Sequence, residues 1–396
     1  MNISKIYGIN GTLNCFKVLG VIVLLSLYCP TMILSQSSLV FPNDNWVQID
    51  DSLSFTWNEC SNADSYEISF SNSAQFTVED IISVVDSSYE DDFSYGKYYW
   101  RVRCIIGGSP SSWSNIRSFA ITDLNNFGNI AFWIAADSNV VKDVNDDVSE
   151  WNDIGSNNID FIQPAPSPQP KWEDSIEKLN NKPSMNFDGV DDFLEATVSN
   201  LNIAELFVVA NWKGAQTNFP GFNGLIMPNN GLLFYVGQSG TTNFFSDAST
   251  AFIGNNFINR QSTINFGPIN KFKLVHGSRA SPTNYSGTAF RVGRDRNLAN
   301  RFWNGYVPEI IGFSTPLSAA NLDSVHQYLR FKYAPPENLG FDFSKYSFCD
   351  TTLSAGTRFE SYLWSTGETT ETITINESGT YWVEVVDIFG FPSSVT

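Results

Sequence analysis

Three acidic residues that could hold a metal ion lie within one short segment. Asp188 is followed by a glycine, and Asp191 and Asp192 come shortly after it. The Asp-Gly pair predicts a turn, with the two later aspartates leading into a strand. Oxygen-rich loops suit Ca²⁺, so we regard these three carboxylates as a candidate calcium site. The alternative is an acidic turn that is merely solvated.

Two other kinds of site lack the residues that they need. The acidic run 143–147 alternates like an EF-hand loop, but Val148 replaces the required glycine and Ile154 stands where the twelfth ligand belongs. The chain has two histidines, His276 and His326, with no nucleophile-elbow motif and no zinc-site spacing. We therefore expect both histidines to be structural or exposed.

Aromatic residues among Asn- and Gly-rich loops could bind sugar. Exposed rings stack on the apolar faces of sugars, and neighbouring polar side chains bind the hydroxyl groups. The candidates are Trp212, Tyr235, Phe244 and Trp303, with Arg294 as a donor. The alternative is that most of these rings pack in the core, which would leave one or two exposed.

One carboxylate stands in an otherwise apolar row. Val307, Glu309 and Ile311 should share one face of a strand. Glu309 is therefore a candidate ligand-binding or metal-binding residue. The alternative is a structural ion pair with Arg291 or Arg294 on a neighbouring strand.

Composition limits the class of protein. The 396 residues are 42% hydrophobic, 15% aromatic and 16% charged, which suits two to four β-rich domains. A formal net charge of −18 repels phosphate backbones, so nucleic acid is excluded as a partner. We expect a glycan or a surface protein as partner instead.

The N-terminus predicts export. Lysines precede an apolar run, residues 18–28, which has the length of a signal-peptide core and is too short to span a bilayer. We predict a signal peptide over residues 1–35 and a secreted or cell-surface protein. Since no other stretch is long and apolar enough, the chain should not span a membrane.

Residues 37–124 predict a sandwich of short strands. Phe55 alternates with polar neighbours, and Trp57, Tyr66 and the strand beginning Gly96-Lys-Tyr-Tyr-Trp follow. With Trp113-Ser114, these residues resemble a fibronectin type III domain, in which Tyr98 would be the corner tyrosine.

This resemblance implies that the second and sixth strands end at the same pole. Cys60 lies just past the second strand and Cys104 at the end of the sixth. We therefore predict a disulfide between Cys60 and Cys104. The alternative is two buried free thiols.

Residues 125–335 carry three pieces in a fixed order. These are Val148-Ser-Glu-Trp-Asn-Asp, Phe187-Asp-Gly-Val-Asp-Asp and Asn304-Gly-Tyr-Val-Pro-Glu-Ile-Ile. They resemble the laminin-G-like jelly roll of the concanavalin A-like lectin and glucanase superfamily, found in exported bacterial proteins. Some members bind Ca²⁺, but the resemblance implies no particular ligand. The Glu-x-Asp-x-x-Glu spacing of its glucanases is absent, so we predict no catalytic residues.

A single helix should close this central segment. Ser318 is a suitable N-cap, and Leu322, Val325 and Leu329 follow at helical spacing. The two prolines at 335–336 should end it.

Residues 338–396 resemble a PKD-like or immunoglobulin-like repeat of bacterial adhesins. The resemblance rests on Tyr362-Leu-Trp-Ser-Thr-Gly and Gly379-Thr-Tyr-Trp-Val-Glu-Val-Val. Cys349 lacks the partner that such repeats usually have, and the last strand is cut short. We therefore expect a truncated repeat.

Taken together, the sequence predicts an all-β chain of tandem sandwiches. The expected function is non-catalytic binding of carbohydrate or another surface ligand through the central jelly roll, as in an adhesin. A glycoside hydrolase of the lectin/glucanase fold and a purely architectural surface protein are the alternatives. Apart from Ca²⁺, no cofactor is expected.

Overall fold

The computed structural model describes residues 37–395, apart from 43, 45, 49–50, 95, 122–123, 125–126, 128, 199–200, 229–234, 245–254, 285–287, 297, 336–350, 378 and 380. The predicted signal peptide and Cys349 lie outside the described residues. Within them the chain is β-rich, with one α-helix and one short 3-10 helix. This confirms the all-β fold class with tandem sandwiches.

Two sheets form the N-terminal sandwich, with strand orders β1-β3-β6 and β2-β9-β7-β4-β5, and β8 pairs with β7. The strands are β1 Leu39–Phe41, β2 Trp46–Gln48, β3 Ser52–Trp57, β4 Ser65–Ser71, β5 Asp80–Val84, β6 Ser88–Asp92, β7 Gly96–Ile106, β8 Ser109–Pro110 and β9 Arg117–Ile121. Alternate side chains of both sheets meet in an aromatic core around Phe55, Trp100 and Phe119. The Tyr98 hydroxyl donates to the Ser94 carbonyl at 2.9 Å, as predicted for a corner tyrosine.

The predicted disulfide is present. Cys60 lies just after β3 and Cys104 near the end of β7, and their Cα atoms are 6.4 Å apart. Both cysteines are buried in the same core. The bond therefore ties the two sheets together at one pole of the sandwich.

The central part is built from two large sheets and one small one. The six-stranded sheet has the order β10-β25-β17-β22-β20-β21, the seven-stranded sheet β11-β12-β13-β16-β23-β18-β19, and the small sheet β14-β15-β24. The strands are β10 Ile130–Ala135, β11 Val140–Lys142, β12 Val148–Trp151, β13 Phe161–Ile162, β14 Lys171–Ile176, β15 Lys182–Asp188, β16 Leu194–Val198, β17 Asn202–Ala210, β18 Asn223–Pro228, β19 Tyr235–Gly237, β20 Asn256–Ile258, β21 Gln261–Ser262, β22 Lys273–Asn284, β23 Thr288–Val292, β24 Asn304–Val307 and β25 Glu309–Phe313.

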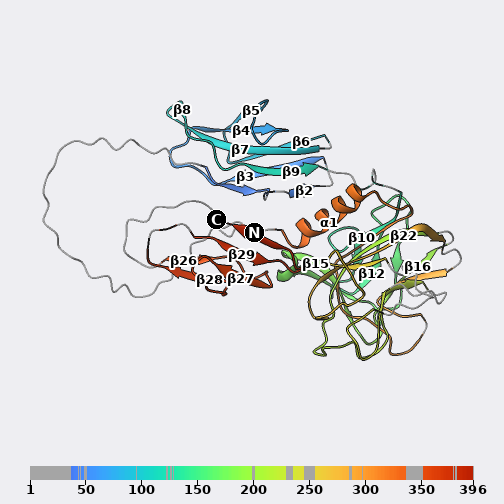
Figure 1. The fold of residues 1–396 in the computed structure, drawn as a ribbon. Helices are drawn as coiled ribbons and strands as arrows, with labels where there is room; N and C mark the ends of the chain where they lie inside the picture. The colour runs from blue at the N-terminus through green and yellow to red at the C-terminus, as the bar shows by residue number, and fades with distance from the viewer. Residues whose placement is uncertain are drawn as a thin grey trace, which may run out of the picture.

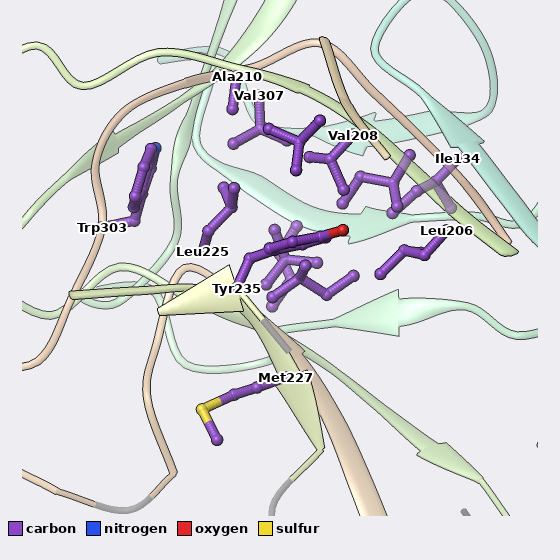
Figure 2. Close-up of a cluster of buried hydrophobic side chains, with 14 of the residues drawn as sticks. Ile134, Leu206, Val208, Ala210, Leu225, Met227, Tyr235, Trp303 and Val307 are labelled. Carbon is purple, nitrogen blue, oxygen red and sulfur yellow. The ribbon is translucent and has the colours of Figure 1, made fainter. Parts of the chain in front are cut away.

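The six-stranded sheet is buried on both faces. Along β17, Leu206 and Val208 point into the core shared with the seven-stranded sheet (Figure 2), whereas Phe207 and Val209 belong to the opposite core. This is why β17 is apolar at nearly every position instead of at alternate ones. The second face must therefore be covered by another element.

Helix α1, Ala319–Tyr333, covers that second face. Ser318 caps it by accepting a hydrogen bond from the Asn321 backbone N–H, as predicted. The apolar cluster beneath the helix also takes in Val47 of the N-terminal sandwich and Ile388 of the C-terminal part. Figure 1 shows α1 between the N-terminal sandwich and the central sheets.

The C-terminal strands form two small sheets, β26-β28 and β27-β29-β30. Their bounds are β26 Thr351–Ser354, β27 Ser361–Trp364, β28 Thr372–Ile375, β29 Val383–Val386 and β30 Pro392–Val395. They have a core of their own around Trp364. Lys178, in the 3-10 helix η2 (Glu177–Leu179), donates to the carbonyls of Thr357 and Phe359 at 2.9 and 3.0 Å. The C-terminal sheets are thus attached to the central part by direct contacts.

We expect replacement of both cysteines, Cys60→Ala with Cys104→Ala, to lower the free energy of unfolding of the N-terminal sandwich by about 2–4 kcal/mol. The reason is that the bond closes a long loop, with a sequence separation of 44. Urea unfolding followed by tryptophan fluorescence measures this change, and Cys349→Ala is the control. Two free thiols at these positions in non-reduced peptide maps would contradict the assignment.

Candidate functional site

The four aromatic residues proposed for sugar stacking lie together, but in the core. Trp212 and Trp303 have ring centroids 5.3 Å apart, and Tyr235 and Phe244 are 5.2 Å apart. Each is at most 2% exposed. Figure 2 shows Tyr235 and Trp303 among aliphatic side chains. Their ring faces are covered in this structure, which corresponds to the core-packing alternative.

Arg294 is half-buried between two other rings. Its guanidinium carbon lies 5.0 Å from the ring centroid of Phe193 and 5.1 Å from that of Phe302. The neighbouring Arg291 forms an ion pair with Glu195 across β16 and β23. Neither arginine is the partner of Glu309, so that part of the prediction is wrong.

Glu309 is a buried carboxylate that four donors satisfy. Its Oε1 accepts from Trp133 Nε1 at 2.7 Å and from the Tyr328 hydroxyl at 3.0 Å. Its Oε2 accepts from Lys332 Nζ at 2.8 Å and from the Tyr333 hydroxyl at 2.7 Å. Three of these donors come from α1, so Glu309 fixes the helix on the sheet.

Lys332 completes this buried pair. Burial alone would lower the pKa of its ammonium group. The neighbouring groups, Glu309 first and then Tyr328, Tyr333 and Asp137, together outweigh that effect, and the pKa lies well above its usual range. Lys332 Nζ also contacts Asp137 Oδ1 at 2.9 Å. The partner was missed because it lies on the helix, whereas strand alternation points only to neighbouring strands.

The three acidic residues at the end of β15 do converge. The carboxylate oxygens of Asp188, Asp191 and Asp192 lie within 4.8 Å of one another. The backbone N–H of Asp188 donates to Asp192 Oδ2 at 2.8 Å, and that of Val190 donates to Asp188 Oδ1 at 2.7 Å. Gly189 has a φ of +79°, which closes the predicted turn. These oxygens are of the kind that a hard cation such as Ca²⁺ prefers, and they supply part of the six to eight ligands that Ca²⁺ takes.

Asp192, the buried carboxylate of this cluster, has a raised pKa. Asp192 is 5% exposed. Burial and the nearby charges of Asp188 and Asp191 raise its pKa to about 7. A bound cation would oppose these effects by favouring the ionised form.

A pocket lies beside α1, where the helix meets the C-terminal strands. Its volume is about 310 Å³, at the lower end of the range for small-molecule sites. It is lined by Arg260, His326, Gln327, Arg330, Phe331 and Phe391. Sequence reasoning named His326 only as a structural or surface residue and missed the others.

Separate elements bring these side chains together. His326, Gln327, Arg330 and Phe331 share one side of α1 because residues three and four positions apart are neighbours on a helix. Arg260 lies in the turn between β20 and β21, at a φ of +66°. The adjacent Asn259 also has a positive φ, which is typical of a tight hairpin turn. The asparagine before Arg260 was the one feature of the sequence that could have placed Arg260 in a hairpin turn.

His326 lies at the inner side of the pocket. It is 7% exposed, and its Nδ1 has no hydrogen-bond partner among the described residues. Burial, followed by the charges of His276 and Arg260, lowers its pKa to about 3. The imidazole is therefore neutral at neutral pH, and the positive charge of the pocket comes from its arginines.

Comparisons with known proteins give only weak structural likenesses. No protein-family model matches the sequence, and no curated protein matches it. The chain is similar to a fibronectin type III-like protein from Clostridium thermocellum, at 17% identity over 23% of this chain and 96% of that one, with a TM-score of 0.20. It is similar to a human fibronectin type III domain, from the KIAA0970 protein, at 13% identity over 23% and 76%, with a TM-score of 0.20.

Another likeness covers more of the chain. A sialidase from Trypanosoma rangeli, solved with the inhibitor DANA, is 11% identical over 75% of this chain and 53% of the sialidase, with a TM-score of 0.29. At these TM-scores the likenesses carry no argument about this chain. The strand pattern of residues 37–121 by itself describes a β-sandwich of two sheets.

We expect Glu309→Gln to lower the free energy of unfolding by about 3 kcal/mol or more, because it leaves the Lys332 ammonium buried without its main counter-charge. Urea denaturation of the full chain measures this loss. Glu384→Gln, an exposed glutamate on β29, is the matched control and should change stability little. A loss below about 1 kcal/mol, which is typical of surface ion pairs, would contradict the role given to Glu309.

The raised pKa of Asp192 predicts a pH dependence. Between about pH 4 and about pH 7 the Asp192 carboxyl of the folded chain keeps a proton that the same group of the unfolded chain has released. The free energy of unfolding should therefore fall as the pH rises, by up to about 1.4 kcal/mol per pH unit. Asp192→Asn should remove this slope, whereas Asp146→Asn should keep it. Thermal unfolding at several pH values tests the difference, and an identical slope in Asp192→Asn would count against the assignment.

Proposed function

We propose that this chain is an exported, non-catalytic surface protein that binds carbohydrate through its central sandwich. The observation that carries the proposal is the pocket beside α1. Hydrogen-bonding side chains there stand next to an apolar wall formed by Phe331 and Phe391. Sites for small polar ligands combine a concave apolar surface with a few fixed polar groups.

The polar groups of the pocket are held in place before any ligand arrives. Arg330 Nε donates to Asp387 Oδ2 at 2.7 Å, and Gln327 Nε2 donates to Asp323 Oδ2 at 2.6 Å. Preorganised side chains lose little freedom on binding, which favours affinity for a small ligand. The pocket therefore has room for one sugar unit and is lined by polar side chains that are fixed in position.

The environment of the acidic groups supports a non-catalytic role. Glycoside hydrolysis needs two carboxyl groups about 5–10 Å apart that face the same cleft. Several buried carboxylates of the described chain are instead occupied by cations, hydroxyl groups or backbone N–H groups, namely Asp153, Glu205, Asp295, Glu309 and Asp387. Each of these groups therefore has its partners within the fold.

Export is supported by the disulfide and by the N-terminal sequence. Disulfides persist in oxidising compartments, and Cys60–Cys104 closes the core of the first sandwich. The predicted signal peptide over residues 1–35 fits the same compartment. In the described chain, the helices lack the length and apolar content that a membrane span requires.

Calcium belongs to this proposal as a structural ion. Asp188, Asp191 and Asp192 would hold it, and it would neutralise a cluster of like charges at the end of β15. Millimolar Ca²⁺ should then raise the melting temperature of the full chain at neutral pH.

A purely architectural role is the second candidate. It is favoured by the apolar cluster under α1, which joins residues of the N-terminal sandwich, the central sheets and the C-terminal strands. Such a junction holds the three parts in one arrangement, as a spacer on a cell surface would require.

A glycan array probed with the full chain, with Ca²⁺ and with chelator, separates the two functions. We expect saturable binding that Gln327→Ala weakens by roughly tenfold, because the pocket loses a fixed amide. Gln216→Ala, an exposed glutamine in a loop of the central part, should bind as the unchanged chain does. Trp303→Ala is unsuitable as a binding variant because that ring lies in the core.

A blank array in both conditions, with the chain shown to be folded by circular dichroism, would overturn the carbohydrate proposal. It would leave the architectural role as the better account. Binding that Gln327→Ala and Gln216→Ala change equally would show that the pocket is not the site.

A further inference from the structure

The charged side chains that line the pocket beside α1 are all hydrogen-bond donors. Its two charged groups, Arg260 and Arg330, are both guanidinium groups that belong to different elements. Guanidinium carries N–H donors only and binds carboxylate in a matched, fork-like geometry. The pocket therefore offers more donors than acceptors.

Each guanidinium group forms an ion pair with one aspartate, and this pair uses only part of its N–H groups. Arg330 pairs with Asp387 through Nε, and Arg260 pairs with Asp323 through Nη2. Among the described residues, these are the hydrogen bonds that the two guanidinium groups make. The remaining N–H groups of both stay available for a ligand.

The aromatic rings of the pocket do not favour a neutral sugar. The Arg330 guanidinium carbon lies 4.7 Å from the ring centroid of Phe391 and covers that ring. Phe331 is 7% exposed. Since neutral sugars are held largely by stacking on open ring faces, these rings act as an apolar wall, and such a wall strengthens charge interactions beside it.

Arg260 also occupies a costly backbone position. Its φ of +66° lies in the left-handed region, which is unfavourable for a non-glycine residue. Glycine is the preferred second residue of a tight Asn-led hairpin turn. An arginine at this position lowers the stability of the fold relative to glycine. What it adds in return is its guanidinium group, which glycine lacks.

We propose that this pocket binds the carboxylate of an acidic sugar, a uronic acid unit, between Arg260 and Arg330. This inference rests on the proposed carbohydrate binding and narrows its ligand class. The acceptor oxygen of Gln327, whose amide N–H is directed to Asp323, takes a sugar hydroxyl. Of the overall charge of −18, the part that lies beyond about 10 Å is screened at 0.1 M salt. The nearby charges that compete with an anionic ligand include those of Asp323 and Asp387.

The test is calorimetric titration of the full chain with glucuronate and galacturonate, beside glucose, galactose and acetate as probes. We expect the uronates to bind at least roughly tenfold more tightly than the neutral sugars, because only they supply a carboxylate to the two guanidinium groups. Acetate should bind far more weakly than the uronates, because it lacks the hydroxyl groups.

The decisive variant is Arg260→Gly. It removes the guanidinium group and relieves the left-handed strain, so we expect it to weaken uronate binding by roughly tenfold or more while the chain keeps or gains thermal stability. Arg296→Gly is the matched control, because Arg296 is another arginine with a positive φ, 49°, and lies outside the pocket. It should bind uronate as the unchanged chain does.

Several outcomes would overturn this inference. Equal affinity for glucuronate and glucose would show that the pocket does not recognise the carboxylate, while the broader carbohydrate proposal would stand. Uronate binding that Arg260→Gly leaves unchanged would place the ligand outside the pocket. Acetate that binds as tightly as the uronates would reduce the site to an anion site without sugar recognition.

Discussion

Both faces of the six-stranded sheet carry large apolar side chains, and neither can be left in water. Leu206 and Val208 face the seven-stranded sheet, and Phe207 and Val209 face the opposite side. Helix α1 covers that opposite side, and residues from the two terminal sandwiches extend the same cluster. The hydrophobic effect that stabilises the central sheet therefore also joins the three parts of the chain.

Within that cluster, Glu309 decides how α1 lies. A buried carboxylate is costly unless it is paired and hydrogen-bonded, and its donors Tyr328, Lys332 and Tyr333 all come from the helix. These contacts turn one side of α1 to the sheet. The rotation of the helix then places Gln327 and Arg330 on the side that lines the pocket. A structural ion pair and a candidate binding site are thus linked through one helix.

The two candidate sites differ in how they are built. The acidic cluster comes from one turn of the chain, so its members are close in sequence, and Asp192 shows the effect of the crowding in its raised pKa. The pocket draws on a hairpin turn, a helix and the C-terminal strands, each held by a different aspartate or core. It exists only when these elements are assembled.

The sequence alone determined the features that depend on local periodicity. Strand alternation, the Ser318 cap and the acidic turn at Asp188 follow from residues close together in the chain. The role of Tyr98 as a corner tyrosine was implied by the resemblance to a fibronectin type III domain. The disulfide between Cys60 and Cys104 also followed, once the fibronectin type III-like strand order was assumed.

Tertiary structure decided the rest, because burial depends on what covers a residue and not on its type. Trp212 and Trp303 have the composition of a sugar platform, yet the packing of two sheets encloses them. Glu309 pairs with a lysine of the helix because α1 crosses the sheet at that point. Arg260 and Arg330 are ordinary in sequence and 70 positions apart. Only the docking of a hairpin, a helix and a terminal strand brings their charges to one pocket.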